Sequence, residues 1–326
     1  MKIFVIILNW NNKDLTLECL QSLQKIKVPP KSQVFLLVVD NGSTDESVRE
    51  IKKLKSKVQN DKSKFKIILI ENKKNLGYAE GNNVGMRYAL GKGADYLLVV
   101  NNDIKVDENF LVSRGAGSRT AGQLIEVAES DSRIGIVSPK IYFAPGCEFH
   151  KERYKKDERG KVIWYAGGII DWDNILSSHR GVDEVDKSQY DSGVETDYAS
   201  GSCMLIKREV LEKIGLLDKK FFMYWEDADL SQRAKKAGWK VLYVPQAKIW
   251  HKVAASSAIG SSLNDYYLIR NRLIFGLRYA RLRTKFALFR DSIKTLLKGR
   301  RWQRIGVRDF YLRRFGQGSY STKIDG

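Results

Sequence analysis

The stretch IFVIILNWNN, residues 3–12, decides the fold that this sequence predicts. Its first six residues are apolar without a break, which is typical of a strand buried on both faces of a parallel sheet. The run is too short for a membrane span or for the apolar part of a signal peptide. It stops at Asn9, so the sequence predicts a central strand that ends in a polar loop.

Three further apolar runs follow at residues 34–39, 65–70 and 96–100, and amphipathic helices are expected between them. The pattern at residues 43–46 is that of a capping box that opens the second of these helices. Alternating strands and helices predict an α/β fold, in which helices flank a mostly parallel sheet.

The second half of the chain is less regular. Two strands and two helices are expected there, at residues 203–206, 241–244, 208–214 and 227–237. Residues 145–195 are polar and rich in Gly and Asp, which favours surface excursions from the sheet. The Gly-rich residues 114–123 lack the Gly-Lys pair of a phosphate-binding loop, so we expect a flexible insertion, with a functional lid as the alternative.

Length and charge limit the class of protein. With 326 residues, 43% of them hydrophobic, the chain can form one large folded domain with an appendage. The formal net charge is +19, and residues 265–314 contain fifteen Lys and Arg against three Asp. Such a segment attracts polyanions, whether phospholipid headgroups, nucleic acid or phosphorylated substrates. Three widely separated cysteines favour neither a disulfide framework nor a zinc site, and they fit a reducing, cytosolic setting.

Polar side chains follow all four expected strands of the first half. Ligands of open parallel sheets bind outside the carboxyl ends of the strands, so these residues are the first candidates for a site. Loops are polar in general, which explains any single one of these ends, but four together favour a convergent site. The polar ends are Asn9, Trp10, Asn11 and Asn12; Asp40, Asn41, Gly42 and Ser43; Glu71 and Asn72; and Asn101, Asn102 and Asp103.

Two strand ends offer ligands for a nucleotide. Asp103 is a candidate ligand for a divalent cation that bridges diphosphate oxygens, with a turn former or helix cap as the alternative. His251, after another expected strand, would complete this metal site unless it is an ordinary core or surface histidine. Asp40 is a candidate acceptor for the imide N–H of uracil or thymine, and an Asx-turn is the alternative.

Residues 75–85 place glycines and amides at the start of a helix. Small residues let a ligand approach the backbone, and unpaired N–H groups of a helix N-terminus bind anions. Asn75, Gly77, Gly81 and Asn82 are therefore candidate ligand-binding residues. Close packing of the helix is the alternative explanation for the glycines.

Residues 224–229 join two aromatic side chains to three carboxylates at the expected start of a helix. Stabilisation of the helix N-terminus would explain one acidic residue. Three of them favour a general base, with Asp227 and Glu226 as candidates, in a pocket where Tyr224 and Trp225 pack on a sugar. The facing acceptor loop is expected upstream, at Ser200, Gly201 and Ser202.

Together these motifs resemble family 2 glycosyltransferases, in particular rhamnosyltransferase-type members from bacteria and archaea. The resemblance covers roughly residues 1–275. The motifs occur in the order seen in the family: NWN at 9–11, VDNGS at 39–43, NLGYAEGNN at 75–83, VNND at 100–103 and WED at 225–227. The triplet Asn-Asn-Asp replaces the usual Asp-x-Asp of the family, which leaves one metal carboxylate.

The resemblance implies a GT-A fold over residues 1–260, with a nucleotide-sugar half at about 1–110 and an acceptor half at about 130–260. It implies an inverting transfer that depends on Mg²⁺ or Mn²⁺. The donor would be a nucleotide diphosphate sugar, either dTDP-rhamnose or a UDP-sugar. The acceptor would be a saccharide or a lipid-linked glycan in cell-surface polysaccharide synthesis.

The resemblance also assigns roles to single residues. Asp227 would deprotonate the acceptor hydroxyl, and Glu226 would orient its neighbours or the acceptor. Asp103 would hold the metal, with His251 close to the metal or the diphosphate. The donor would contact Asp40 through its base, Asn101 and Asn102 through its ribose or sugar, and the motif residues Asn9, Trp10, Asn11, Asn75, Gly77, Gly81 and Asn82.

Residues 261–326 are expected to form basic helices with mixed faces, in which arginines interrupt any transmembrane span. A peripheral contact with the anionic inner face of the cell membrane is the favoured interpretation. A subdomain that packs on the sheet and leaves its charges in solvent is the alternative. Arg270 is also expected to reach the donor diphosphate.

Two other classes of function compete with glycosyl transfer. A sugar-nucleotide nucleotidyltransferase would carry a Gly-rich, basic loop after the first strand, where this chain has Asn9, Trp10 and Asn11. A polyanion-binding protein without catalysis would explain the charge but not the strand ends, so a nucleic acid is not expected as partner. The sequence does not indicate the oligomeric state.

Overall fold

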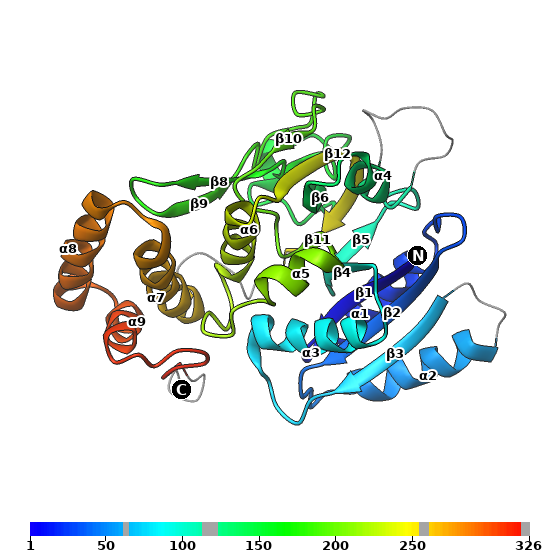
Figure 1. Ribbon diagram of the computed structural model, residues 1–326, viewed down its shortest axis with the longest axis horizontal. Helices are drawn as coiled ribbons and strands as arrows, with labels where there is room; N and C mark the ends of the chain where they lie inside the picture. The colour runs from blue at the N-terminus through cyan, green and yellow to red at the C-terminus, as the bar shows by residue number, and fades with distance from the viewer. Residues whose placement is uncertain (61–64, 113–122, 254–260, 321–326) are drawn as a thin grey trace.

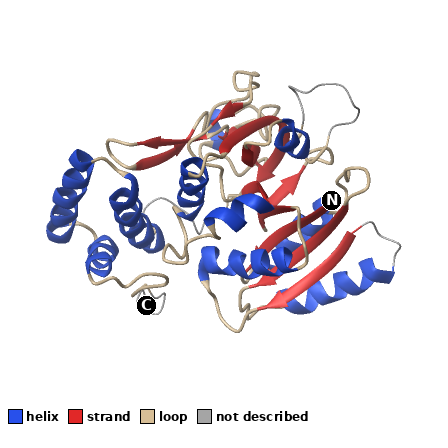
Figure 2. Cartoon of the chain, in the orientation of Figure 1, coloured by secondary structure: helices blue, strands red, loops and turns tan. Residues whose placement is uncertain are grey.

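The computed structural model describes residues 1–60, 65–112, 123–253 and 261–320 (Figure 1). The Gly-rich insertion predicted at residues 114–123 lies outside the described residues except for Gln123. The path through the main sheet has the strand order β10-β12-β6-β11-β4-β1-β2-β3. Helices lie on both sides of these strands, and the C-terminal helices stand at one end of the molecule (Figure 2).

The four strands predicted in the first half are present and mutually parallel. They are β1 (Lys2–Asn9), β2 (Gln33–Asp40), β3 (Phe65–Glu71) and β4 (Tyr96–Asn101). The register pairs Asn9 with Asp40, Asp40 with Glu71, and Leu8 with Asn101. The polar strand ends therefore lie side by side along one edge, as the sequence predicted.

The helices of this half explain why the strands are mostly apolar. They are α1 (Lys13–Leu23), α2 (Ser47–Asn60) and α3 (Gly77–Gly91). Ile3, Val5 and Ile7 pack in one buried cluster with α1 and α2, and Phe4 and Ile6 pack in another with α3. Both faces of β1 are therefore covered.

The second half completes the sheet with mixed pairing. β11 (Cys203–Lys207) is antiparallel to β4 and to β6 (Ile134–Phe143), and β12 (Lys240–His251) is parallel to β6. The short strands are β5 (Ile104–Val106), β7 (Ile163–Tyr165) and β10 (Val194–Glu195), and β8 (Gly168–Asp171) pairs with β9 (Leu176–His179) in a separate hairpin. The remaining helices of this half are α4 (Leu124–Ser130), α5 (Arg208–Ile214), α6 (Glu226–Lys236) and a 3-10 turn at Lys151–Arg153.

Two local predictions were wrong. Residues 145–195 are not simply surface excursions, because they contain four strands, two of which join the main sheet. Residues 43–46 do not form a capping box, because α2 begins only at Ser47 and the Ser43 hydroxyl donates to Asp40 Oδ1 instead (2.6 Å). The predicted fold class, a mostly parallel sheet flanked by helices with a helical C-terminal extension, is confirmed.

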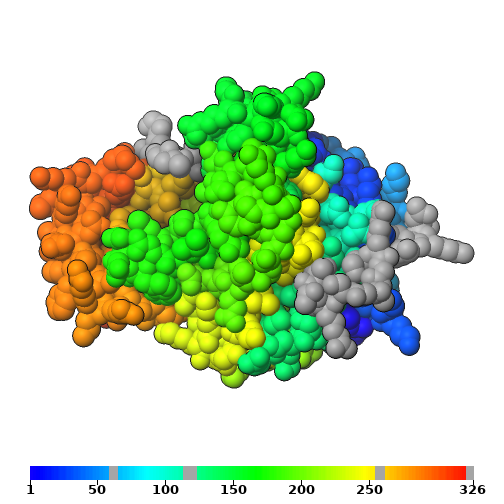
Figure 3. All heavy atoms as spheres, turned by 90° about the horizontal axis from the view of Figure 1, so that it is seen from above, coloured from blue at the N-terminus to red at the C-terminus, as the bar shows by residue number. Residues whose placement is uncertain are grey.

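The C-terminal extension contains α7 (Ser262–Tyr279), α8 (Leu282–Lys298) and α9 (Arg301–Tyr311). Viewed from above, these helices form one end of the molecule and the N-terminal strands and helices form the other (Figure 3). Of the helices in the described ranges, none combines the length and the apolar character that crossing a membrane requires. The predicted boundary at residue 260 stays a prediction.

Candidate active site

Asp40 at the end of β2 is held by its own loop. Its side chain is 2% exposed. Oδ1 accepts hydrogen bonds from the Asn9 amide (2.7 Å) and the Ser43 hydroxyl (2.6 Å), and Oδ2 accepts one from the Ser43 backbone N–H (2.9 Å). This is the turn geometry that the sequence left as the alternative, and base binding by Asp40 stays a prediction.

The same network joins the ends of β1 and β4. Asn9 Oδ1 accepts a hydrogen bond from the Thr16 hydroxyl (2.6 Å), and the Asn102 amide donates to that hydroxyl (2.8 Å). Asn11 Oδ1 accepts a hydrogen bond from the Thr44 N–H (2.7 Å). Asn9 is therefore fully buried, whereas the neighbouring Trp10 is 51% exposed and its ring is accessible to a ligand.

The N-terminus of α3 is already occupied by protein acceptors, which corrects the predicted anion site. The backbone N–H groups of Leu76, Gly77 and Ala79 donate to Asn41 Oδ1 (3.1 Å), Asn75 Oδ1 (2.8 Å) and the Phe222 carbonyl (3.0 Å). These three donors are not available to a phosphate.

Glycines 77 and 81 are explained by packing, again the alternative that the sequence left open. A Cβ atom at Gly77 would lie 2.4 Å from the Phe222 ring, and one at Gly81 would lie 2.6 Å from the Leu8 side chain. The space beside each glycine is therefore filled by protein rather than by a donor. Asn82 is buried, and its Oδ1 has no hydrogen-bond partner within the described residues.

The loop before α6 has an unusual backbone. Phe222, Tyr224 and Trp225 adopt φ angles of 66°, 68° and 75°, which residues other than glycine rarely adopt. The Asn271 amide from α7 donates to the carbonyls of Phe221 (2.8 Å), Met223 (2.7 Å) and Tyr224 (3.0 Å). One buried side chain thus fixes the path of the chain into α6.

The three carboxylates at the start of α6 have different surroundings. Asp229 is fully buried and accepts hydrogen bonds from Arg233 Nε (2.8 Å), the Tyr279 hydroxyl (2.8 Å) and Arg278. Glu226 is 5% exposed, and its Oε2 has no hydrogen-bond partner within the described residues. Burial, together with the charge of Asp227, raises the pKa of Glu226 well above its ordinary value.

Asp227 is half-buried and is oriented by the backbone. Its Oδ2 accepts a hydrogen bond from the Gly201 N–H (2.9 Å), and Oδ1 accepts one from the Ala228 N–H (2.7 Å). Burial raises the pKa of Asp227 above its ordinary value, although these hydrogen bonds oppose the shift. A carboxylate with a raised pKa and a fixed orientation is suited to accept a proton.

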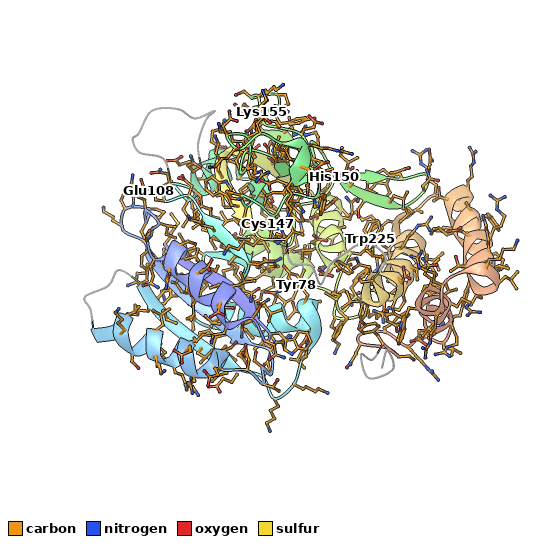
Figure 4. The ribbon with its side chains drawn as sticks, turned by 180° about the vertical axis from the view of Figure 1, so that it is seen from behind. Tyr78, Glu108, Cys147, His150, Lys155 and Trp225 are labelled. Atoms are coloured by element: carbon orange, nitrogen blue, oxygen red, sulfur yellow. The ribbon has the colours of Figure 1, made fainter. Side chains whose placement is uncertain are left out.

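The loop at residues 200–202 and Tyr78 connect Asp227 to the end of β4. The Asn101 N–H donates to the Ser202 carbonyl (3.0 Å), and the Tyr78 hydroxyl donates to the Gly201 carbonyl (2.5 Å). Tyr78 and Trp225 lie at the centre of the molecule in Figure 4. Burial raises the pKa of Tyr78 well above its ordinary value, and the surrounding carboxylates add to this shift.

Asp103 and His251 are brought together as predicted. Asp103 Oδ1 and His251 Nε2 lie 3.1 Å apart. Within the described residues, neither Asp103 Oδ1 nor His251 Nδ1 has a hydrogen-bond partner, and no cluster of three or more His, Cys, Asp and Glu is placed to hold a metal ion. The pair therefore offers two protein ligands, and a bound cation would need further ligands from a diphosphate or water.

An aromatic group that sequence reasoning missed lies beside His251. The Trp164 ring packs edge-on against both His251 (centroids 4.5 Å apart) and His179 (4.3 Å). Burial lowers the pKa of His179 to about 4, so this histidine is neutral near pH 7. The apolar run at Ile163, Trp164 and Tyr165 was the available signal.

Two predicted site residues have structural roles instead. Arg270 is fully buried, and its guanidinium donates to the carbonyls of Gly316 (2.7 Å) and Phe221 (2.9 Å), so it is not available to a donor diphosphate. Trp225 is 6% exposed and packs on the Phe275 ring (centroids 4.7 Å apart), so it does not offer a wall to an acceptor sugar.

Comparison with known proteins identifies the chain. Residues 4–113 match the family described as Glycosyl transferase family 2, and residues 178–266 match Glycosyltransferase like family 2. These matches include the strand ends and the start of α6. The chain belongs to glycosyltransferase family 2. It is an enzyme of the glycosyltransferase class.

Curated relatives of this glycosyltransferase include rhamnosyltransferases. The N-acetylglucosaminyl-diphospho-decaprenol L-rhamnosyltransferase of Mycobacterium tuberculosis is 28% identical over 245 residues, which cover 72% of each chain. The rhamnosyltransferase WbbL of Escherichia coli is 26% identical over 239 residues, which cover 65% of this chain and 80% of that protein.

Solved structures share the fold of this glycosyltransferase. GalNAc-T7 with UDP, GalNAc and Mn²⁺ gives a TM-score of 0.65 at 18% identity, over 91% of this chain and 51% of that one. The mannosyltransferase PcManGT from Pyrobaculum calidifontis, in complex with GDP-Man and Mn²⁺, gives 0.54 at 15% identity, over 99% and 77%. At this low sequence identity, the structural similarity shows the fold alone. It confirms the predicted GT-A architecture.

Two hollows of this glycosyltransferase lie away from Asp103 and Asp227. One, of about 200 Å³, is lined by Arg180, Thr196 and Lys235 among others. The other, of about 330 Å³, lies between the β8–β9 turn and α8. A cleft shared by Asp103 and Asp227 stays a prediction.

Proposed function

We propose that this glycosyltransferase moves rhamnose or a hexose from a nucleotide diphosphate sugar to a saccharide or a lipid-linked glycan in cell-surface polysaccharide synthesis, with inversion at the anomeric carbon. The names of its rhamnosyltransferase relatives support this donor and acceptor class. A dTDP-rhamnosyl transferase of Shigella flexneri, RfbF, is also 22% identical over 281 residues, 83% of this chain and 79% of that one.

Asp227 is the proposed general base, and its geometry carries the proposal. The Gly201 and Ala228 N–H groups hold its carboxylate in place, and burial raises its pKa toward the range useful at neutral pH. Removing the acceptor's proton makes the acceptor oxygen a better nucleophile. Attack from the face opposite the leaving diphosphate inverts the anomeric centre.

Asp103 and His251 are the proposed ligands of Mg²⁺ or Mn²⁺. Asp103 Oδ1 lies 3.1 Å from His251 Nε2 and accepts no hydrogen bond from the residues that the structure describes, which fits a cation that takes its other ligands from the donor. Mn²⁺ is named in the titles of the two similar solved structures. When bound there, the cation would neutralise charge that develops on the departing nucleoside diphosphate.

The proposed donor contacts are the strand-end side chains that remain accessible. Trp10 and Asn11 are exposed, and Asn75, Asn101 and Asn102 are partly exposed. The buried Asn9 amide donates to Asp40 at the same strand ends, and Asn11 Oδ1 accepts a hydrogen bond from the Thr44 N–H. Aromatic and amide groups at strand ends suit a nucleoside and its sugar.

The decisive experiment compares wild type with Asp227→Asn. Purified enzyme is screened for slow hydrolysis and transfer with dTDP-rhamnose and then with UDP-hexoses. We expect kcat of the Asn variant to fall by about 10²–10⁴-fold, because the base is lost, while donor affinity changes little. An Asp227→Asn enzyme as active as wild type would refute the base. A wild type that turns over none of these donors would refute the proposed donor class.

Metal dependence is tested separately. Excess EDTA is expected to abolish transfer, and added Mg²⁺ or Mn²⁺ to restore it, because Asp103 and His251 supply only two ligands and bind the cation through the donor complex. Asp103→Asn should require a higher Mn²⁺ concentration for half-maximal activity. Full activity in EDTA would contradict the metal role.

A further inference from the structure

Helix α8 has its apolar side on the outside. Its exposed apolar residues recur at helical spacing, so they form one stripe along the helix. They are Leu282 (75% exposed), Phe286 (73%), Phe289 (53%), Ile293 (43%), Leu296 (37%) and Leu297 (73%). The buried residues of α8 are Thr284, Leu288 and Ser292, two of which are polar. This arrangement is the reverse of an ordinary surface helix.

Specific contacts fix this orientation of α8. The Thr284 hydroxyl donates to the Trp172 carbonyl (3.3 Å), and the Ser292 and Tyr311 hydroxyls are hydrogen-bonded to each other (2.7 Å). A Cβ atom at Gly276 of α7 would lie 2.3 Å from the Leu288 side chain, so the two helices approach closely there. The stripe therefore cannot turn inward without breaking contacts on α7, on α9 and on the loop after β8.

Basic side chains flank the stripe. At about 100° per residue, Arg283, Arg290 and Lys294 fall on one side of it and Lys285 on the other. The first three are exposed. The larger segment at residues 265–314 has fifteen Lys and Arg against three Asp. An exposed apolar stripe with cationic borders matches the interface of an anionic bilayer, where apolar side chains enter the acyl boundary and cations contact headgroups.

We infer that α8 docks this enzyme on an anionic lipid surface, with Phe286 and Phe289 inserted below the headgroups. A second copy of the chain is a poorer occupant, because a twofold interface would bring two strongly basic segments together. The inference narrows the membrane contact expected for residues 261–326 to one face of one helix. It also deepens the proposed function, because docking would bring the site to a lipid-linked acceptor.

The experiment is vesicle flotation of the purified full-length protein without any sugar donor, so its outcome does not depend on the proposed activity. Vesicles contain phosphatidylcholine alone or with phosphatidylglycerol, at low and high salt. Wild type should float with the anionic vesicles at low salt, and bind less at high salt because screening weakens the ionic part. The Phe286→Ser/Phe289→Ser double variant should lose at least about tenfold in vesicle affinity.

Two control variants separate the apolar and ionic parts. Phe149→Ser removes a ring that is 53% exposed, as much as Phe289, but that lies between β6 and β7 on the body of the enzyme. It should bind vesicles like wild type. Arg290→Gln/Lys294→Gln should weaken binding to anionic vesicles and leave the low binding to neutral ones unchanged. Circular dichroism checks that each variant is folded.

Three results would overturn the inference. The first is wild type that stays unbound with anionic vesicles at low salt. The second is a folded Phe286→Ser/Phe289→Ser variant that floats like wild type. The third is a wild-type dimer in light scattering that the double variant converts to monomer, which would make the stripe an interface between copies of this chain.

Discussion

At the residue scale, the start of α6 shows that position in the sequence does not determine the role of a carboxylate. Glu226, Asp227 and Asp229 lie within four positions of each other, and only the family resemblance assigned separate roles to Asp227 and Glu226. Asp229 is neutralised by Arg233 and Arg278, Asp227 is held by two backbone N–H groups, and Glu226 Oε2 has no partner within the described residues. Asp229 is structural, Asp227 is oriented and partly exposed, and burial raises the pKa of Glu226.

Glu226 should make the stability of the enzyme depend on pH. Its pKa is raised in the folded protein, so the folded state keeps a proton that the unfolded state releases above its ordinary pKa of 4.5. Stability contributed by this group is therefore present at low pH and is lost as pH rises. Gln at this position has no proton to lose, so the free energy of unfolding of Glu226→Gln should increase relative to wild type as pH rises above about 5, by up to about 1.4 kcal/mol per pH unit.

Urea denaturation of both proteins across this range measures the difference. Glu50→Gln is a matched control, because Glu50 lies on the surface of α2 and the neighbouring Lys53 and Arg49 lower its pKa. A difference between Glu226→Gln and wild type that stays constant with pH would show that Glu226 is ionised in the folded protein.

Some relations between residues could be predicted from the sequence and others could not. The sequence predicted that Asp103 and His251 would meet, because both end strands that point to one edge of the sheet. It did not predict that Arg270 would be buried, because its acceptors are the carbonyls of residues 220, 221, 314 and 316, far along the chain. The contact between Asp103 and His251 follows from their positions after predicted strands. The burial of Arg270 depends on tertiary structure.

At the element scale, the loop before α6 is a strained segment held by α7. Three residues with positive φ cost about 1–3 kcal/mol each unless their surroundings impose that conformation. Asn271 imposes it through three carbonyls, and the Phe222 ring stacks on Tyr267 (centroids 5.2 Å apart). Helix α7 therefore fixes the path of the loop that leads to Asp227.

Asn271→Asp should disturb catalysis without changing donor binding. The carboxylate replaces the amide with an acceptor that faces three carbonyl oxygens, so the loop must move. We expect kcat to fall by about 10–100-fold, since a shift of about 1 Å at a base has effects of this size, and KM for the donor to stay within about twofold.

Leu268→Ala is the control, because Leu268 lies on the same helix and is 42% exposed. It should leave kcat unchanged. Equal losses of kcat in Asn271→Asp and Leu268→Ala would mean that α7 acts only through general stability. An unchanged kcat in Asn271→Asp would contradict the positioning role directly.

Element prediction succeeded where burial alone decides the pattern and failed where distant partners decide it. The strands β1 to β4 are mostly apolar runs, with Lys66 of β3 as an exposed exception, and their predicted positions agree with the structure. The central strand β6 was missed because Ser138, Pro139 and Lys140 interrupt its pattern. Lys140 is fully buried there because Asp186 (2.9 Å) and Asp191 (2.6 Å) accept from its ammonium group, and neither is near it in sequence.

At the scale of the whole molecule, the end of the chain returns to the loop before α6. After α9, the Gly316 N–H donates to the Lys220 carbonyl (2.9 Å), and Arg270 donates to the carbonyls of Gly316 and Phe221. The Tyr267 hydroxyl donates to the Gln317 carbonyl (3.0 Å). The C-terminal extension therefore supports the candidate active site through its inner side and presents α8 on its outer side.

A chain truncated after Tyr311 should be less stable and less active, although it keeps every residue of the candidate site. Arg270 would lose the Gly316 and Arg314 carbonyls as acceptors while keeping those of Lys220 and Phe221, and a lost hydrogen bond to a charged group costs about 1.5–3 kcal/mol. Thermal unfolding should shift to lower temperature and kcat should fall with it. Truncation after Tyr320 removes none of these contacts and should match wild type in both measurements. If the chain ending at Tyr311 matched wild type as well, the returning segment would have no part in holding Arg270, and the loop before α6 would depend on Asn271 alone.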